Sequence, residues 1–302
     1  MLNDKFIGFQ HWNIKGRDYK EFMSHLPLEG TEMEQIGMAT DDDYPIYGVK
    51  YGDTDGDNVL MIVTGIHAGP EWVICEAARE FLKALIHPER HPEQERHLRW
   101  INDYFDGVYW VPIASPWSFV HNSRDNKNGV DLNRDFNAEN PQAETQVIKE
   151  VVHRIQPTVM IDGHETSARG AALAGIRNDN DIHAAYIHKV YLAIKIATVL
   201  LGDERAHYHG LLGGAAPGEL RRWGATVPTN KQGGQIESTL IEIGNGYSGN
   251  NFKERRARRG INLLFASVLA FIPFVHTPYD VHQYDEKADA YTKTGRHEMR
   301  MK

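Results

Sequence analysis

The sequence contains a single cysteine, no long apolar run and no excess of positive charge. A lone cysteine, Cys75, excludes an intramolecular disulfide, and its place on an apolar helix face predicts a buried thiol. The longest apolar run, residues 263–275, is shorter than the roughly 20 residues that a membrane-spanning helix needs. The N-terminal segment lacks the apolar core of a secretory signal. These absences predict a cytoplasmic protein with no membrane partner.

Charge excludes another class of partner. The chain has 33 lysines and arginines against 41 aspartates and glutamates, for a formal net charge of −8. An acidic chain lacks the electrostatic footprint of a nucleic-acid-binding protein, so we expect no nucleic-acid partner. One basic stretch, residues 253–259 (KERRARR), runs against this trend. Its place at the start of a predicted helix favours a solvated helix face.

The order of the predicted elements indicates one α/β domain over residues 1–302. Strands are predicted at residues 47–51, 59–64, 108–113, 158–162 and 238–243, and helices at residues 17–26, 70–86, 141–155, 182–201 and 251–271. Their alternation without a low-complexity linker predicts a three-layer α/β/α architecture around a mixed, mostly parallel twisted sheet.

Three connecting segments carry further expectations. Residues 115–134 form a long polar loop of the kind that is usually functional. Residues 213–234 are rich in glycine and proline and are predicted to be a flap or surface loop. Residues 52–58 (GDTDGDN) look a little like a calcium loop but lack the glutamate at loop position 12, so a hairpin turn is predicted there.

Polar side chains lie at the ends of three predicted strands. His67 and Glu71 follow one strand in the segment GIHAGPE, and His164 follows another in DGHET. Glu242 lies near the end of the last strand. Open α/β sheets bind their ligands at the carboxyl ends of the strands. Two imidazoles and a carboxylate suit a catalytic zinc site, and a further glutamate suits a general base.

Taken singly, these residues also have ordinary structural interpretations. His67 can bond to backbone at a strand end, and Glu71 can be a charge that the helix dipole favours. His164 can simply pair with Asp162 or Glu165. The segment HYH, residues 207–209, is a rival candidate metal site, although little nearby completes it.

Glu242 and the long loop carry a stronger functional signal. A carboxylate among the apolar residues of a strand is costly unless it has a partner or faces a cleft, which favours Glu242 over Glu237 as the functional residue. Arg124, Asn133 and Arg134 lie in or at the end of the loop, where arginine grips carboxylates and asparagine adds a donor. Hydrogen bonds within the loop are the alternative. Together the clusters are stronger evidence for a functional site than each is alone. Independent coincidences would otherwise have to place the metal ligands, the general base and the carboxylate-binding residues along one chain.

These residues resemble the M14 zinc metallocarboxypeptidase family, which includes murein-peptide amidase-like enzymes and is related to the aspartoacylase and succinylglutamate desuccinylase branch. The resemblance spans about residues 45–270. Its most specific part is the segment RDNKNGVDLNRDF, residues 124–136, in which the arginine, the GVDLNR run and their spacing fit the family pattern.

The resemblance implies a zinc carboxypeptidase-like fold, one zinc ion per chain and a role for each site residue. The implied metal ligands are His67, Glu71 and His164. The implied catalytic residues are Glu242, as general base, and Arg124, which polarises the scissile carbonyl. Arg124, Asn133 and Arg134 are implied to bind the substrate and hold its terminal carboxylate, and Asp131 is implied to accept a hydrogen bond from His67. Such an acceptor fixes the tautomer of a ligand histidine and raises its basicity.

The sequence departs from the family pattern in three places. Three residues separate His67 from Glu71, where the family has two. No tyrosine lies between residues 209 and 241, where the family's carboxypeptidases supply one, which leaves Tyr208 as a candidate. The segment DGHET is closer to the Asp-x-His of the acylase branch than to the His-Ser of digestive enzymes.

The sequence therefore predicts a zinc-dependent metallocarboxypeptidase that hydrolyses the C-terminal amide bond of a small peptide with a free carboxylate. Zinc-activated water and the glutamate base would carry the reaction. The alternative is an N-acyl-amino-acid amidohydrolase with the same metal and base. A non-catalytic binding domain with a degenerate site is the second alternative, and it depends on the irregular spacing of His67 and Glu71.

Overall fold

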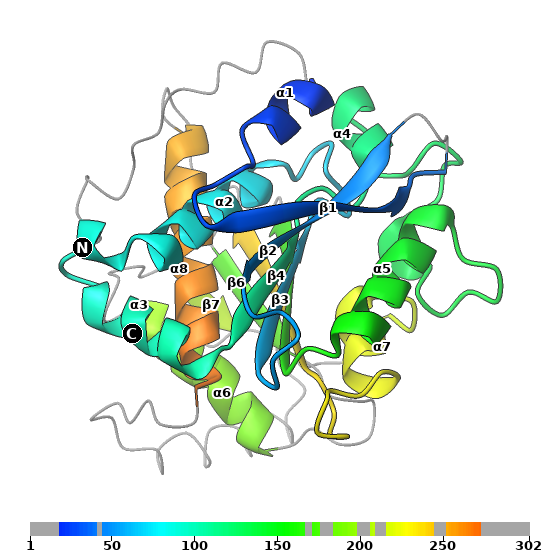
Figure 1. The fold of residues 1–302 in the computed structure, drawn as a ribbon. Helices are drawn as coiled ribbons and strands as arrows, with labels where there is room; N and C mark the ends of the chain where they lie inside the picture. Colours follow the sequence, from blue (N-terminus) through cyan, green and yellow to red (C-terminus); the bar gives the residue numbers. More distant parts are fainter. Residues whose placement is uncertain are drawn as a thin grey trace.

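The protein is built around one mixed sheet of eight strands, seen here in a computed structural model (Figure 1). The structure describes residues 18–40, 44–166, 171–175, 184–197, 206–208, 216–244 and 252–272. The strands lie in the order β1-β2-β4-β3-β5-β8-β6-β7. Their bounds are β1 Thr31–Met38, β2 Pro45–Gly52, β3 Val59–Thr64, β4 Gly107–Val111, β5 Val159–Thr166, β6 Ala171–Gly175, β7 Ala206–Tyr208 and β8 Glu237–Gly244.

The middle of the sheet is parallel, as predicted. Strands β4, β3, β5 and β8 run in one direction, whereas β1, β2 and β6 pair antiparallel with their neighbours β2, β4 and β8. The hairpin predicted at residues 52–58 is wrong, because β4 lies between β2 and β3. All six residues of β3 are buried, which is typical of a central strand with parallel partners on both sides.

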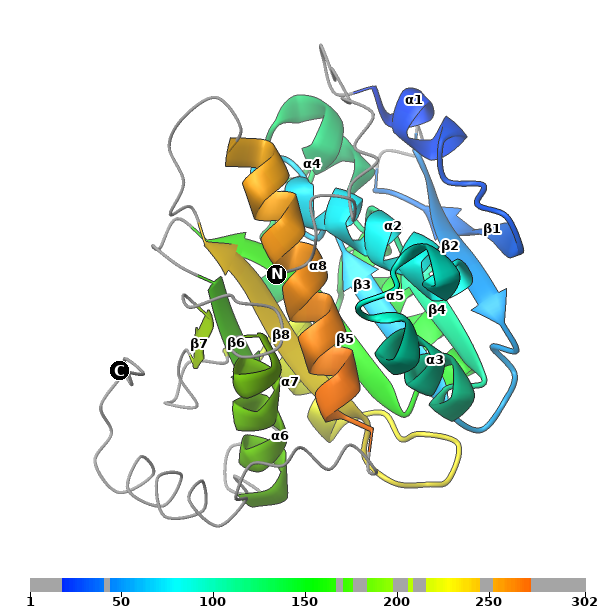
Figure 2. The same ribbon diagram turned by 90° about the vertical axis from the view of Figure 1, so that its left-hand side faces the viewer.

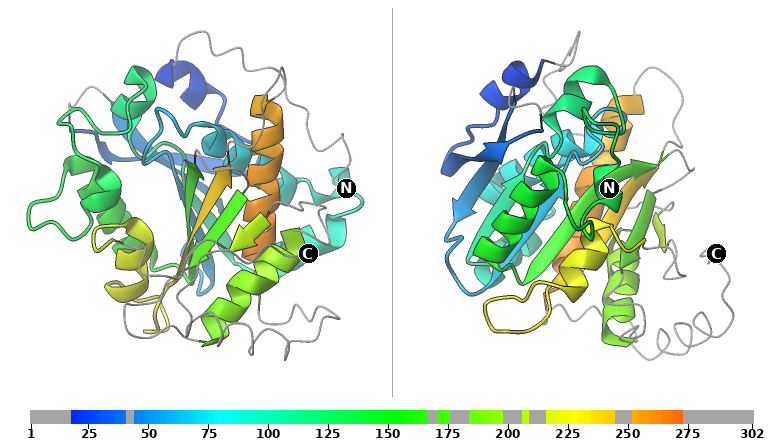
Figure 3. Two further views of the ribbon diagram at one scale, coloured as in Figure 1. Left: turned by 180° about the vertical axis from the view of Figure 1, so that it is seen from behind. Right: turned by 90° about the vertical axis from the view of Figure 1, so that its right-hand side faces the viewer.

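Helices cover both faces of the sheet, which confirms the three-layer architecture (Figures 2 and 3). One face carries α2, α3, α6 and α8, and the other carries α5 and α7. The bounds are α1 Tyr19–Ser24, α2 Val73–Ile86, the 3-10 turn Pro88–Arg90, α3 Glu95–Tyr104, α4 Pro116–His121, the 3-10 turn Leu132–Arg134, α5 Ala143–Ile155, α6 Ala184–Lys195, α7 Leu220–Thr226 and α8 Phe252–Ala270.

The sheet divides the apolar interior into two cores. Successive residues of a strand point to opposite faces, so Leu60 joins the core beneath α2 and α8 while Met61 joins the core beneath α5 and α7. In the second core Trp223 of α7 is 2% exposed and packs on Phe136, with the ring centroids 5.8 Å apart. This contact fixes α7 against the end of the long loop.

Several element boundaries differ from the sequence prediction. Helix α2 begins at Val73 rather than at residue 70, because the preceding residues form a separate turn. Strand β5 continues to Thr166 through residues that were expected to follow it. The predicted flap at residues 213–234 contains α7, and the predicted loop at residues 115–134 contains α4. Tertiary packing explains α7, since a Cβ on its Gly224 would lie 2.1 Å from the terminal methyl of Met160.

Two expectations from composition concern described residues. Cys75 is fully buried on α2, as predicted. Within the described ranges, the helices are too short or too polar to cross a lipid bilayer.

Candidate metal centre

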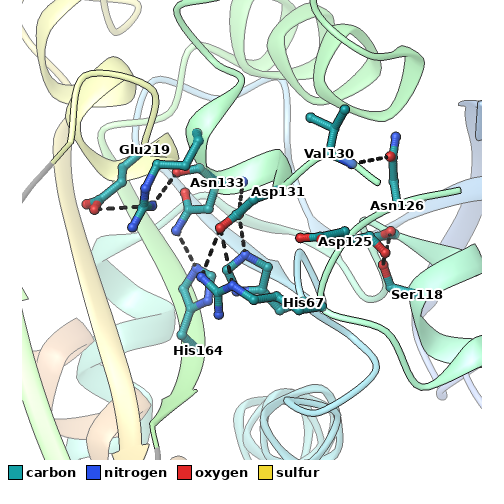
Figure 4. A network of polar contacts seen from close by, with 12 residues as sticks. His67, Ser118, Asp125, Asn126, Val130, Asp131, Asn133, His164 and Glu219 are labelled. Atoms are coloured by element: carbon teal, nitrogen blue, oxygen red, sulfur yellow. Dashed lines mark hydrogen bonds and ion pairs between the residues drawn. The ribbon is translucent and has the colours of Figure 1, made fainter. Parts of the chain in front are cut away.

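Three potential metal ligands meet at the carboxyl edge of the central strands. His67 lies after β3, His164 lies in β5, and Glu71 lies just before α2. All three side chains are buried, and one ligand atom from each lies within 4.8 Å of the others. Figure 4 shows His67 and His164 side by side beneath the loop that carries Asp131 and Asn133. Within the described part of the chain, no other histidine, cysteine or acidic side chains form such a group.

A tight turn brings Glu71 back to His67 despite the longer spacing. The backbone N–H of Glu71 donates to the carbonyl of His67 at 3.1 Å, which closes one helix-like turn. Residues four apart on such a turn share a face, so His67 Nδ1 lies 3.1 Å from Glu71 Oε1. Gly69 lets the turn pass close to the long loop, since a Cβ there would lie 2.2 Å from the carbonyl oxygen of Ser123. The turn accommodates the extra residue.

Two neighbouring strands supply the other side of the centre. His164 of β5 is directly opposite Glu242 of β8 in a parallel pair, so their side chains emerge on the same face of the sheet. Glu242 is half-buried. Glu237 is opposite Val159 at the other end of the pair, where Lys189 binds it. The sheet thus places Glu242 beside the cluster and Glu237 away from it.

Each histidine presents one nitrogen to Glu71 and anchors the other. His164 Nδ1 lies 2.8 Å from Glu71 Oε2, as His67 Nδ1 faces Oε1. His67 Nε2 lies 2.7 Å from Asp131 Oδ1. His164 Nε2 lies 2.8 Å from Asp162 Oδ1, an ion-pair contact, and 3.1 Å from Asn133 Nδ2. The Asp131 carboxylate at His67 Nε2 holds the ring proton of that histidine there, and the Nδ1 atoms of both histidines face the Glu71 carboxylate.

Charge outweighs burial for the groups of this cluster. Burial raises the pKa of Glu71, but His164 and His67 outweigh it and hold that pKa well below the usual range. Burial also raises the pKa of Asp131, and its hydrogen bond and charge interaction with His67 help to hold it well below the usual range. Burial lowers the pKa of His164, yet Asp162 and Glu71 raise it well above the ordinary value. The cluster strongly favours bound positive charge.

The donor set and its charge fit a divalent metal ion. With neutral histidines, the carboxylates of Glu71, Asp131 and Asp162 and the guanidinium of Arg124 leave two net negative charges. Ligands at about 2.0–2.1 Å around a tetrahedral zinc ion lie roughly 3.3 Å from one another. The Nδ1 atoms lie 2.8 and 3.1 Å from the Glu71 oxygens, close to that spacing. Two histidines and a glutamate are a ligand set of zinc hydrolases.

Arg124 lies at the exposed rim of the cluster. Its Nη1 donates to Glu71 Oε1 at 3.2 Å, and its Nε and Nη2 donate to Asp131 Oδ2 at 3.2 and 3.1 Å. Its side chain is 47% exposed. The guanidinium thus touches both the Glu71 and the Asp131 carboxylates and remains partly open to solvent.

The two other predicted substrate-binding residues differ in exposure. Asn133 is buried, with Nδ2 facing His164 and Oδ1 accepting the backbone N–H of Leu220 at 2.9 Å. Arg134 is half exposed; its Nη1 donates to the carbonyl of Asn133 and lies 3.4 Å from Glu219 Oε1. Asn133 therefore connects the metal cluster to α7, whereas Arg134 presents a cation to solvent at the same edge.

Sequence reasoning missed an ion pair on the opposite face of β5. Arg256 was assigned to a solvated helix face at residues 253–259, but both it and Arg259 are buried. Arg256 Nη2 pairs with Oε2 of Glu165, the residue next to His164. No local sequence pattern predicts this ion pair, because Arg256 and Glu165 lie 91 residues apart. A buried partner for Glu165 therefore overturns the solvated-face prediction for this arginine.

The HYH segment is only partly within the described residues. His207 and Tyr208 lie in β7, but their side chains and the whole of His209 are outside the described part of the structure. The roles suggested for these residues therefore stay predictions.

The fold, unlike the sequence, matches known proteins. No protein-family model matches the sequence, and no curated protein matches it. The metallo-carboxypeptidase from Burkholderia cenocepacia superimposes with a TM-score of 0.68 at 19% identity, covering 84% of this chain and 68% of that one.

Two further solved structures give the same result. The metallo-carboxypeptidase from Pseudomonas aeruginosa in complex with (2-guanidinoethylmercapto)succinic acid has a TM-score of 0.62 at 18% identity, covering 82% of this chain and 66% of that one. Carboxypeptidase A from Helicoverpa armigera has a TM-score of 0.60 at 17% identity, with 84% and 72% covered. The expected metallocarboxypeptidase fold is confirmed.

Proposed function

We propose that the protein is a zinc-dependent metallocarboxypeptidase that removes the C-terminal residue of a small peptide with a free carboxylate. The observation that carries this proposal is the convergence of His67 Nδ1, His164 Nδ1 and the Glu71 carboxylate at one buried point on a carboxypeptidase fold. Both histidines are anchored from behind, which is typical of a metal site rather than of two buried histidines that pack by chance.

His67, Glu71 and His164 would hold the metal, which when bound supplies Lewis-acid activation of water and of the scissile carbonyl. Glu242 would take the proton released by the attacking water and pass it to the leaving amine, a role that its place opposite His164 supports. The exposed guanidinium of Arg124 would donate hydrogen bonds to the carbonyl oxygen as negative charge develops on it. One such donor contributes on the order of 100- to 1,000-fold in rate.

The free carboxylate of the substrate would be held at the edge formed by Asn133 and Arg134. Arg134 is the exposed cation of this pair and supplies the charge, because a guanidinium binds a carboxylate through two parallel hydrogen bonds. Asn133 shapes the same edge and ties it to the cluster through His164. Recognition of a terminal carboxylate would make the enzyme exo-acting.

One observation favours the N-acyl-amino-acid amidohydrolase as the second candidate. Asp162 lies at ion-pair distance from His164 Nε2, so the Asp-x-His arrangement that resembles the acylase branch is present in the fold as well as in the sequence. An N-acyl amino acid also presents an amide beside a free carboxylate, and the same metal ligands, base and cation would serve it.

Substrate panels with mass spectrometry distinguish the two candidates. Zinc-loaded protein would be offered peptides with free C-termini, the same peptides as C-terminal amides, murein-type peptides and N-acyl amino acids, each with a chelator control. We expect chelator-sensitive release from the free-carboxylate peptides, and Glu242→Gln should retain zinc while losing nearly all turnover. Cleavage confined to N-acyl amino acids would favour the second candidate. An active Glu242→Gln would refute the base assignment, and no cleavage with zinc bound would support the non-catalytic binding domain.

A further inference from the structure

Glu165 makes contacts on both sides of β5. Its neighbour His164 points to the metal cluster, so by strand alternation the Glu165 side chain points to the opposite face, toward α2 and α8. These two helices pack side by side on that face (Figure 2). The side chain of Glu165 is 1% exposed, and Arg256 of α8, with a side chain 8% exposed, pairs with its Oε2.

The other carboxylate oxygen of Glu165 caps α2. Oε1 accepts the backbone N–H of Val73 at 2.6 Å and that of Ile74 at 3.2 Å, which are the first two residues of the helix. The N-cap residue itself, Trp72, makes no side-chain capping bond. The first N–H groups of a helix have no partner within the helix, so Glu165 supplies from another strand the acceptor that the local sequence lacks.

The backbone of Glu165 touches the metal cluster directly. Its N–H donates to Glu71 Oε2 at 3.2 Å, on the same oxygen that faces His164 Nδ1. Glu71 lies two residues before Val73. Glu165 therefore binds the Glu71 carboxylate through its backbone N–H. Through its side chain it also binds the backbone N–H groups of Val73 and Ile74, which follow Glu71 in the chain.

We propose that Glu165 and Arg256 are positioning residues that fix Glu71 relative to His164. The inference rests on the proposed function, because it concerns the same metal centre. Gln at residue 165 would weaken the hydrogen-bond acceptor at the start of α2, and Ala would remove it. The start of α2, which directly follows the turn from His67 to Glu71, would then no longer be held against β5. Arg256 supplies the counter-charge that allows a buried carboxylate to serve as this cap, since an unpaired buried charge is strongly disfavoured.

Zinc affinity, measured by competition with a chromophoric chelator at a temperature where every variant is folded by circular dichroism, tests the proposal without using turnover. We expect Glu165→Gln to bind zinc about 10-fold more weakly and Glu165→Ala up to about 100-fold more weakly, the range for groups that orient metal ligands. Arg256→Lys should retain most of the affinity and Arg256→Met should lose it. The double variant Glu165→Met/Arg256→Met removes both buried charges, but it also removes the acceptor for the N–H groups of Val73 and Ile74. Its zinc affinity should therefore remain below that of wild type.

Glu80→Gln is the matched control. Glu80 is also a buried glutamate of α2, and it pairs with Arg79 and Lys83 at 2.9 and 2.8 Å without touching the metal cluster. The Glu80→Gln variant should have a lower melting temperature than wild type and an unchanged zinc affinity. Wild-type affinity in both residue 165 variants, with only their melting temperatures lowered, would reduce the pair to a structural role and overturn the proposal. A wild-type protein that binds no zinc would instead overturn the proposed function.

Discussion

Replacing Asp131 by asparagine tests whether the carboxylate that contacts His67 Nε2 supports metal binding at the candidate centre. The carboxylate accepts a hydrogen bond from His67 Nε2 at 2.7 Å and one from the backbone N–H of Asn133 at 3.0 Å through Oδ1. Its Oδ2 accepts two from Arg124, at 3.1 and 3.2 Å. Asparagine keeps the shape and one acceptor but loses the charge, and its amide nitrogen would face the donors of Arg124.

The expected cost follows from what His67 loses. A neutral amide oxygen is a weaker acceptor for an imidazole N–H than a carboxylate, so His67 becomes a less basic ligand whose ring is less firmly held. Substitution of such a partner typically weakens metal affinity about 10- to 100-fold, or roughly 1.4–2.7 kcal/mol. The donor-to-donor contact at Arg124 adds little to this, because its side chain is 47% exposed and water can separate the groups.

Zinc affinity of Asp131→Asn is measured by chelator competition against wild type. Asp103→Asn serves as the control, because Asp103 is an exposed aspartate near the end of α3, just before β4 begins and thus at the edge of the sheet opposite the cluster. The variant should remain folded and bind zinc about 10- to 100-fold more weakly. Equal zinc affinity in Asp131→Asn and Asp103→Asn would refute the role assigned to Asp131.

Three further predictions follow from the site and its surroundings. Arg134→Ala should raise KM for free-carboxylate peptides on the order of 10- to 100-fold through loss of charge-assisted hydrogen bonds, with zinc affinity unchanged; steady-state kinetics and chelator competition check this. Gly69→Ala should force the turn from His67 to Glu71 away from Ser123, lowering stability by about 1–3 kcal/mol and weakening zinc binding, as thermal melts and chelator competition would show. Burial raises the pKa of Glu76 to about 7, so the folded state loses stability as pH rises from about 4.5 to 7. Glu76→Gln removes this carboxylate, which also pairs with the buried Arg79, so its melting temperature relative to wild type should be higher at pH 8 than at pH 4.

The central strands could be predicted from the sequence because burial on both faces leaves a strong local pattern. Residues 59–64 are an unbroken apolar run that ends in glycine, and the structure makes them β3. The candidate ligands His67 and His164 could be proposed for the same reason, since strand ends and turns are visible locally. Edge strands give a weaker signal: β1 (TEMEQIGM) mixes charged and apolar residues and is largely half exposed, so no strand was expected there.

The remaining features depend on contacts that no short window contains. Strand β5 was expected to stop at residue 162 because the residues after it are polar. One of them, His164, belongs to the candidate metal cluster on one face, and Glu165 meets Arg256 on the other. Helix α7 was hidden in a segment rich in glycine and proline, although Trp223 packs it firmly on Phe136. In each case tertiary partners, absent from the local pattern, decide the structure.

The spacing of His67 and Glu71 shows how such partners change the meaning of a motif. Three intervening residues set this chain apart from the pattern it resembles, and the hypothesis of a degenerate site depended on that difference alone. In the fold the extra residue lengthens a turn that the hydrogen bond from Glu71 N–H to the His67 carbonyl closes. A displaced ligand would leave its partners unsatisfied, yet both oxygens of Glu71 are engaged, one by His67 and Arg124 and the other by His164 and Glu165. The longer spacing is therefore not evidence for a degenerate site, because the surrounding residues, rather than the number of residues between His67 and Glu71, set the geometry of the candidate metal centre.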